Sequence, residues 1–255
     1  MHFIHNRHNL KMAVLVQQPP KQRGLVFIMH GLGGVMNQTQ FATIAPVFID
    51  AHYTVVRFDT TNSFGQSEGH YEDATTTGYY HDLEDVIAWA TKQPWYVEPF
   101  VLVGHSVGGL CTAMFAQKHP QKVQALSPLS TVVSGKLRLQ TITENEALEW
   151  QKTGSREYKS STTPGRMKRL PWSHMEDAMH YDLLPEASKL VMPVLMVVGS
   201  EDDRTPLKQQ QLLYKALPGP KELHIIEGAR HNFKEESHLH KLASIFAAWI
   251  HKYLT

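Results

Sequence analysis

The sequence has very little of what marks a secreted, membrane-spanning or nucleic-acid-binding protein. Its 255 residues include one cysteine, Cys111, which cannot form an internal disulfide and therefore agrees with a reducing compartment. Near the start, the apolar run over residues 12–16 is too short for a secretory leader and for a membrane span. We expect a protein without a membrane span, located in the cytoplasm.

Neither sign of charge is in excess. Lys and Arg number 25 and Asp and Glu number 24, so no basic surface that would attract nucleic acid is expected. The 16 histidines are many for this length, but no two share metal-ligand spacing with Cys or Glu on a clear helix face. The sequence thus predicts no nucleic-acid partner and no metal ion.

Short apolar runs alternate with helical patterns over most of the chain. Such alternation is typical of an α/β fold with a mostly parallel sheet and helices on both faces. The first two runs, at 2–6 and 10–16, instead predict an antiparallel hairpin at the sheet edge. Further strands are expected at 24–30, 53–58, 100–104, 123–126, 194–198 and 222–226. Helices are expected at 41–51, 79–92, 107–118, 207–217 and 239–253.

This alternation stops between residues 131 and 188, where only 144–152 and 174–179 look helical. A long irregular insertion in a compact domain is usually a lid or a binding loop. We therefore expect a core domain made of residues 1–130 and 189–255, with an inserted lid at 131–188. Trp150, Trp172 and Met175 are its candidate substrate contacts.

Three cations of the same segment, Arg166, Lys168 and Arg169, could meet a negative group of the substrate or only water. We expect them to be solvated, because Lys and Arg are rarely buried without a partner.

Two pentapeptides fit the G-x-S-x-G pattern of a nucleophile elbow, in which a serine stands on a sharp turn from strand to helix. Ser106, in GHSVG at 104–108, follows an apolar strand and precedes a buried helical run. Ser67, in GQSEG at 65–69, follows a polar stretch and precedes a charged, turn-prone one. The context favours Ser106 as the nucleophile and a loop role for Ser67.

A serine hydroxyl is a weak nucleophile at neutral pH, so it needs a histidine base and an acid that orients this histidine. With a nucleophile elbow the chain order is Ser, then Asp or Glu, then His. The strand expected at 194–198 is followed by Glu201, Asp202 and Asp203, and spacing alone does not choose among them. The strand expected at 222–226 is followed by His231, the candidate base.

The negative charge that develops on the attacked carbonyl oxygen needs two backbone amides as donors. One should be the amide of Val107, directly after the nucleophile. The other should come from the glycine-rich turn HGLGG at 30–34, where neighbouring glycines let the amide of Leu32 point inward.

Taken together, these motifs resemble those of the α/β-hydrolase superfamily. Within it they resemble the small serine esterases that include feruloyl (cinnamoyl) esterases, monoacylglycerol lipases and serine aminopeptidase-like hydrolases. The resemblance runs nearly end to end and rests on 30–34 (HGLGG), 57–59 (RFD), 63–69 (SFGQSEG), 104–109 (GHSVGG), 199–206 (GSEDDRTP) and 228–231 (GARH). It implies Asp202 as the acid, with Pro206 four residues further on. It also implies that 65–69 is a non-catalytic loop braced by Asp59.

The residues and the resemblance predict a serine carboxylesterase that hydrolyses short-to-medium acyl or hydroxycinnamoyl esters through an acyl-enzyme. No cofactor is expected. The same triad could instead cleave amide, thioester or carbon–carbon bonds, and a non-catalytic ligand-binding hydrolase fold is a third alternative. A small-molecule ester is the expected partner, and a homodimer is compatible with the sequence.

Overall fold

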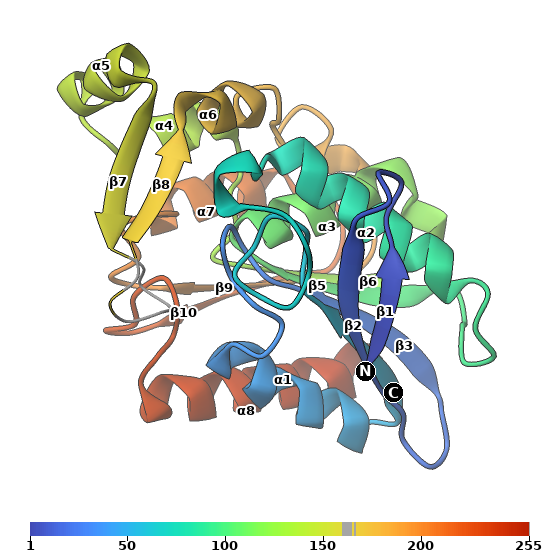
Figure 1. Ribbon diagram of the computed structural model, residues 1–255. Coiled ribbons are helices and arrows are strands. Elements are labelled where there is room, and N and C mark those ends of the chain that lie inside the picture. The colour runs from blue at the N-terminus through green and yellow to red at the C-terminus, as the bar shows by residue number, and fades with distance from the viewer. Residues whose placement is uncertain (160–164, 166, 255) are drawn as a thin grey trace.

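An eight-stranded sheet runs through the centre of the structure (Figure 1). The computed structural model describes residues 1–159, 165 and 167–254. From one edge to the other, the strand order is β1-β2-β4-β3-β5-β6-β9-β10. The strands are β1 (His2–His5), β2 (Lys11–Gln17), β3 (Gly24–Met29), β4 (Tyr53–Phe58), β5 (Phe100–His105), β6 (Val123–Leu129), β9 (Val194–Gly199) and β10 (Lys221–Ile226).

The directions of the strands confirm the predicted fold class. β1 and β2 form the expected antiparallel edge hairpin, β2 pairs antiparallel with β4, and the remaining pairs are parallel. Every residue of β3, β4, β5 and β9 is buried, as expected for strands covered on both faces. Because parallel strands end at the same edge of a sheet, the loops after β3, β5, β9 and β10 meet there.

Helices cover both faces of the sheet, as Figure 1 shows. On one face lie α1 (Thr39–Asp50) and α8 (Glu236–Tyr253), joined by an edge contact between Phe48 and Phe246. On the other face lie α2 (Thr76–Ala90), α3 (Val107–Lys118) and α7 (Leu207–Ala216). Single 3₁₀ turns occupy Tyr71–Asp73, Pro120–Lys122 and Ala187–Lys189.

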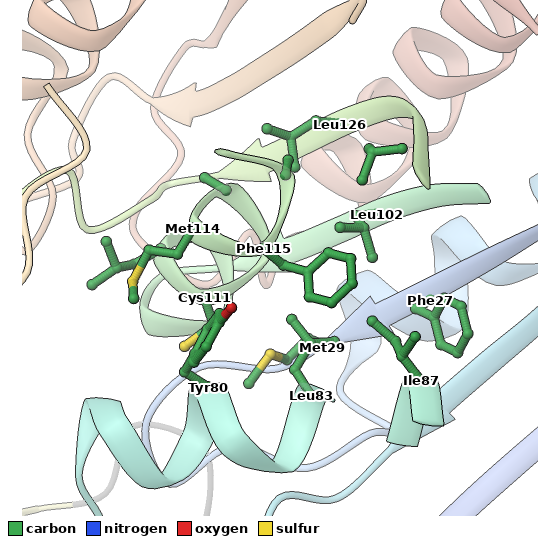
Figure 2. Packing of buried hydrophobic residues seen from close by; sticks show 14 of the residues in the cluster. Phe27, Met29, Tyr80, Leu83, Ile87, Leu102, Cys111, Met114, Phe115 and Leu126 are labelled. Carbon is green, nitrogen blue, oxygen red and sulfur yellow. The ribbon is translucent and has the colours of Figure 1, made fainter. Parts of the chain in front are cut away.

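Large apolar side chains fill the space between the sheet and α2 and α3 (Figure 2). The rings of Phe27 on β3 and Phe100 on β5 meet edge to face, with their centroids 5.0 Å apart. Cys111 of α3 is fully buried in this cluster, and its burial raises the pKa of the thiol. Burial of each large side chain contributes about 1.5–3 kcal/mol, so the sheet is a firm platform for the loops at its edge.

Residues 131–188 carry regular structure that the sequence pattern does not reveal. They form α4 (Gly135–Leu139), α5 (Glu144–Thr153), β7 (Ser155–Lys159), β8 (Met167–Pro171) and α6 (Trp172–Ala178). The two expected helices correspond to α5 and α6, but the expectation of an otherwise irregular segment was wrong. β7 and β8 pair as an antiparallel hairpin, and the charged residues Arg156 and Lys168 at its less exposed positions hide its alternating pattern.

We call residues 131–188 the cap. The cap contacts α2 through α6 and the turn Tyr71–Asp73 through β8. Its own small cluster is centred on Trp150, whose indole nitrogen donates to the carbonyl oxygen of Leu170 at 2.9 Å and whose ring meets that of Trp172 edge to face. The cap is thus a packed unit, and its action as a lid stays a prediction.

Within the described part of the chain, no helix is both long and apolar enough to cross a membrane.

The turn from β5 into α3 depends on backbone contacts that only glycine allows. A Cβ atom on Gly104 would lie 2.2 Å from the carbonyl oxygen of Gly108, and one on Gly108 would lie 2.4 Å from that of His30. Both distances are far inside van der Waals contact. The two glycines of the elbow motif therefore let α3 begin directly against the end of β3.

We expect Gly104→Ala to lower the free energy of unfolding by about 1–3 kcal/mol, the usual effect of overpacking a closed contact. Urea denaturation followed by circular dichroism measures this change. Gly78→Ala in α2 is the control, because its added Cβ meets only the hydroxyl of Thr75, at 3.1 Å, and alanine favours the helix. Equal losses in the two variants would contradict the close-contact argument.

Candidate active site

Ser106 stands between β5 and α3 in a strained backbone conformation, with φ 57° and ψ −117°. For a residue other than glycine, a positive φ is uncommon and is found where the surroundings enforce it. Here the Ser106 amide donates to the carbonyl oxygen of Leu129 at 3.0 Å, which fixes the turn against β6. The residue is half-buried and lines a pocket at the carboxyl edge of the sheet. This is the geometry expected of a nucleophile elbow.

The hydroxyl of Ser67, in contrast, is engaged in holding its loop. It donates to the carbonyl oxygen of Asp59 at 2.6 Å and accepts from the amide of Ala13 at 2.9 Å. The Asp59 carboxylate accepts from the amides of Gln66 and Met36, at 2.8 and 2.7 Å, so it braces this loop as expected. Ser67 thus has a structural role, although it fits the same motif as Ser106.

His231 follows β10 and is held by Asp202. Its Nδ1 lies 2.9 Å from Asp202 Oδ2 and 3.0 Å from Oδ1, and both residues are buried. A proton on Nδ1 donated to this carboxylate leaves Nε2 as the basic nitrogen. His231 and Ser106 line the same pocket. The arrangement therefore presents a base beside the elbow serine.

Asp202 is the only one of the three candidate carboxylates that is buried; Glu201 and Asp203 are exposed. The backbone amides of Arg204 and Thr205 donate to its Oδ1, each at 3.0 Å. Burial alone would raise its pKa, but the hydrogen bond and charge of His231, together with the Thr205 amide, outweigh burial and hold the pKa well below its usual range. Asp202 thus stays ionised at neutral pH and fixes the His231 tautomer.

The predicted oxyanion donors also meet at the pocket, since Leu32 and Val107 line it together with Ser106. Val107 is the first residue of α3, where amides have no acceptor inside the helix. The turn that carries Leu32 is fixed by His30, which accepts from the Thr60 amide through Nε2 at 3.0 Å and donates from Nδ1 to the Gly31 carbonyl oxygen at 2.8 Å. Burial lowers the pKa of His30, in agreement with this neutral form.

Sequence reasoning missed His105, the residue before the elbow serine. Its Nε2 lies 2.8 Å from the carbonyl oxygen of His231, and the two ring centroids are 4.6 Å apart. Burial, and then the neighbouring His231, lower the pKa of His105 to about 3, so the ring is neutral and donates this hydrogen bond. His105 therefore positions the backbone of the base. Its place in GHSVG was the only signal in the sequence.

Residues of the cap line the pocket together with Ser106. Of the three predicted cap contacts, Trp150 and Met175 line the pocket, whereas Trp172 lies behind Trp150 and is not among the described lining residues. His174 also lines it and was not predicted; its Nδ1 lies 3.0 Å from the Ala74 carbonyl oxygen, and burial lowers its pKa to about 4. Whether these residues touch substrate stays a prediction.

Comparison with known proteins supports the fold described above. A family model for the alpha/beta hydrolase fold matches residues 24–149. Est1E from Butyrivibrio proteoclasticus, solved with ferulic acid bound, superposes with a TM-score of 0.84 at 20% identity over 100% of this chain and 99% of that one. The chain has the fold of an α/β hydrolase. As its motifs predicted, it resembles the serine esterases of that superfamily.

Relatives of this hydrolase are also found by sequence. The mouse (Mus musculus) palmitoyl-protein thioesterase ABHD10, a mitochondrial protein by name, is 24% identical over 244 residues, which cover 93% of this chain and 78% of the relative. The bovine (Bos taurus) protein of that name is 27% identical over 187 residues, or 73% and 59% of the two chains. The solved mouse structure gives a TM-score of 0.81 at 22% identity, covering 100% of this chain and 99% of that one.

The cations of the cap correct one expectation about this hydrolase. Lys168 is 4% exposed: its amine donates to the Gly33 carbonyl oxygen at 3.3 Å and lies over the rings of Phe64 and Tyr71, so the prediction that it is solvated was wrong. Aromatic faces from a distant segment, which attract cations, bury the amine. Arg169 is exposed as expected and pairs with Glu72 at 3.6 Å. Arg166 lies outside the described residues.

Among the described residues of the hydrolase, no group of three or more His, Cys, Asp or Glu side chains is arranged to hold a metal ion.

The elbow geometry predicts selective chemical labelling. A fluorophosphonate probe should label the wild-type hydrolase at Ser106, as identified by peptide mass spectrometry, because this serine lines the same pocket as His231. Ser106→Ala should abolish labelling, and Ser67→Ala, the matched variant in the second motif, should retain it. Labelling that survives in Ser106→Ala would rule out the assignment.

Proposed function

We propose that this hydrolase cleaves carboxylic esters of short acyl groups, with Ser106 as nucleophile, His231 as general base and Asp202 as the acid that orients the base. One observation carries the proposal: a histidine whose Nδ1 is bound to a buried carboxylate lines the same pocket as the strained elbow serine. A hydroxyl, a base and an orienting acid are the three parts that nucleophilic acyl transfer requires.

In the first half of the proposed reaction, Ser106 Oγ attacks the ester carbonyl carbon while His231 Nε2 takes the hydroxyl proton. The amides of Leu32 and Val107 would stabilise the oxyanion of the tetrahedral intermediate. Its collapse breaks the bond to the alcohol oxygen, which leaves with the proton from His231. In the second half, His231 takes a proton from a water molecule, which attacks the carbonyl carbon of the acyl-enzyme. The bond to Ser106 Oγ then breaks and His231 returns the proton to Oγ, so the carboxylic acid and free Ser106 are released.

The size of the pocket supports the shorter end of the predicted substrate range. The pocket encloses about 60 Å³ of free volume, well below the roughly 300–1,000 Å³ of sites that hold drug-sized ligands. Trp150, Leu170 and Met175 fill the side toward the cap. A short acyl group therefore fits this arrangement better than a long alkyl chain or a hydroxycinnamoyl group.

Thioester hydrolysis is the second candidate, because the sequence relatives carry the name palmitoyl-protein thioesterase. The same triad can cleave an oxygen ester and a thioester. A thiolate is a better leaving group than an alkoxide, so its departure depends less on a proton from His231. The small free volume argues against a palmitoyl chain, so a thioester substrate would also carry a short acyl group. The cytoplasmic location of this protein stays a prediction, and the relatives found by sequence are named as mitochondrial proteins.

Loss of either the nucleophile or the acid should abolish turnover. For 4-nitrophenyl butyrate, we expect Ser106→Ala to leave only background hydrolysis and Asp202→Asn to lower kcat by a factor on the order of 10⁴, because the asparagine amide favours the wrong histidine tautomer. Ser67→Ala is the control and should keep its kcat. Activity in Ser106→Ala comparable to that of the wild type would refute the mechanism.

Chain length and bond type distinguish the two candidates. We expect kcat/KM to fall from 4-nitrophenyl acetate and butyrate to the octanoate, since the longer chain must displace cap residues. The S-ester of butyrate and thiophenol, followed by thiol release, measures the thioester activity. Preference for octanoate would contradict the short-acyl proposal. A kcat/KM for the thioester far above that for the oxygen ester would make thioesters, and not oxygen esters, the assigned substrate class.

A further inference from the structure

The pocket over Ser106 carries a concentration of positive charge that the mechanism does not use. Arg138 of α4, Arg156 of β7, Lys168 of β8 and Arg204 after β9 all line it, and no Asp or Glu is among its described lining residues. The whole chain has nearly equal numbers of basic and acidic residues. The gathering of cations therefore reflects the placement of these side chains and not the composition.

Elsewhere in the described structure, six Lys or Arg side chains have carboxylate partners. Arg7 pairs with Glu84 and Asp85, each at 2.9 Å, and Arg169 on the outer face of the cap pairs with Glu72. Among the described residues, by contrast, no carboxylate lies within ion-pair distance of Arg138, Arg156 or Arg204.

Arg156 is held in position mainly by aromatic packing, and the Glu146 carboxylate attracts it only from beyond ion-pair distance. Its guanidinium lies over the ring of Trp150, 3.9 Å from the centroid, and Trp150 is itself fixed by its hydrogen bond to Leu170. Its Nε atom is shielded from solvent and has no hydrogen-bond partner among the described residues. An unsatisfied buried donor on a charged group is costly. The guanidinium is therefore prearranged to donate to a group that the protein does not supply.

The cations also act on one another. Burial, followed by the charges of Arg156 and Arg204, lowers the pKa of Arg138 to about 10, so the three guanidinium groups are close enough to repel. Arg138 uses one donor on Thr141 Oγ1, at 3.0 Å. Arginine side chains stay charged at neutral pH in proteins. An anion between the three guanidinium groups would relieve their mutual repulsion and would accept hydrogen bonds from their remaining N–H groups.

We propose that Arg138 and Arg156, assisted by Arg204, form an anion subsite in the cap half of the pocket, so that the substrate is an ester bearing a carboxylate or a phosphate. The subsite itself rests on the pocket geometry, and its use in catalysis rests on the proposed esterase function. Lys168 is not part of it, because its amine is engaged with the turn that carries Leu32.

A matched pair of substrates tests the proposal. Mono(4-nitrophenyl) glutarate and 4-nitrophenyl pentanoate have acyl chains of equal length that end in a carboxylate and in a methyl group. We expect wild-type kcat/KM to favour the glutarate ester by about 10- to 100-fold at low salt, the effect of one or two charge-assisted hydrogen bonds. Arg138→Gln/Arg156→Gln should lose most of this preference, mainly through KM.

Arg169→Gln is the control variant, because Arg169 lies on the same hairpin but outside the pocket, and it should keep the preference. The ratio of two rates on one sample does not depend on how much of a variant is folded. A second pair, 4-acetoxybenzoate and 4-methylphenyl acetate, places the anion on the alcohol part and supports the subsite equally if it shows the preference. Equal rates within both pairs in the wild type, or a preference retained by the double variant, would overturn the proposal.

Binding without turnover separates this proposal from the esterase function. Glutarate and inorganic phosphate, at equal concentration, should each raise the Tm of Ser106→Ala, and the anion that binds more tightly should give the larger shift. The shift should vanish in the triple variant that also carries Arg138→Gln and Arg156→Gln. If no ester is hydrolysed but the shift is seen, the esterase proposal fails and the subsite stands; if neither anion shifts the Tm, the subsite fails.

Discussion

The close approach of α3 to the end of β3 is the constraint on which the site depends. Gly108 lies against the carbonyl oxygen of His30, so no side chain can separate the first turn of the helix from the strand. This contact holds Ser106 in its positive-φ conformation and brings the amide of Val107 beside the turn that carries Leu32. The free energy that maintains the strained residue comes from the buried sheet and helices around it.

The core and the cap contribute different kinds of group to the pocket. The proposed nucleophile, base and acid all follow strands of the sheet, where buried backbone fixes them to within a narrow geometry. Burial keeps three nearby histidines, His30, His105 and His174, from being charged. The net charge of the pocket therefore comes from Lys168 and three arginines, and of these four cations only Arg204 lies outside the cap. Under the two proposals, the core supplies the reactive groups and the cap supplies most of the groups that recognise the substrate.

Much of the fold could be predicted because its central strands are continuous apolar runs and its helices have an apolar face. Ser106 and His231 could be located in the same way, since each follows such a strand. Asp202 could not be chosen from spacing alone, because Glu201 and Asp203 share its loop and only the folded turn buries one of the three. β7, β8 and α4 escaped prediction because their stabilising contacts come from other segments and leave no periodic pattern of their own.

By itself, the sequence determined the order of strands and helices, the elbow motif, and the order of serine, acid and histidine, because these depend on neighbouring residues and local periodicity. The family resemblance implied Asp202 as the acid, and the tertiary structure placed its carboxylate against His231. Only the tertiary structure decided that the Ser67 hydroxyl is bound within its loop and that Lys168 is buried over two rings. It also decided that the arginines of distant segments share one pocket. Charge and burial depend on which distant side chains come together, and a linear pattern does not record that.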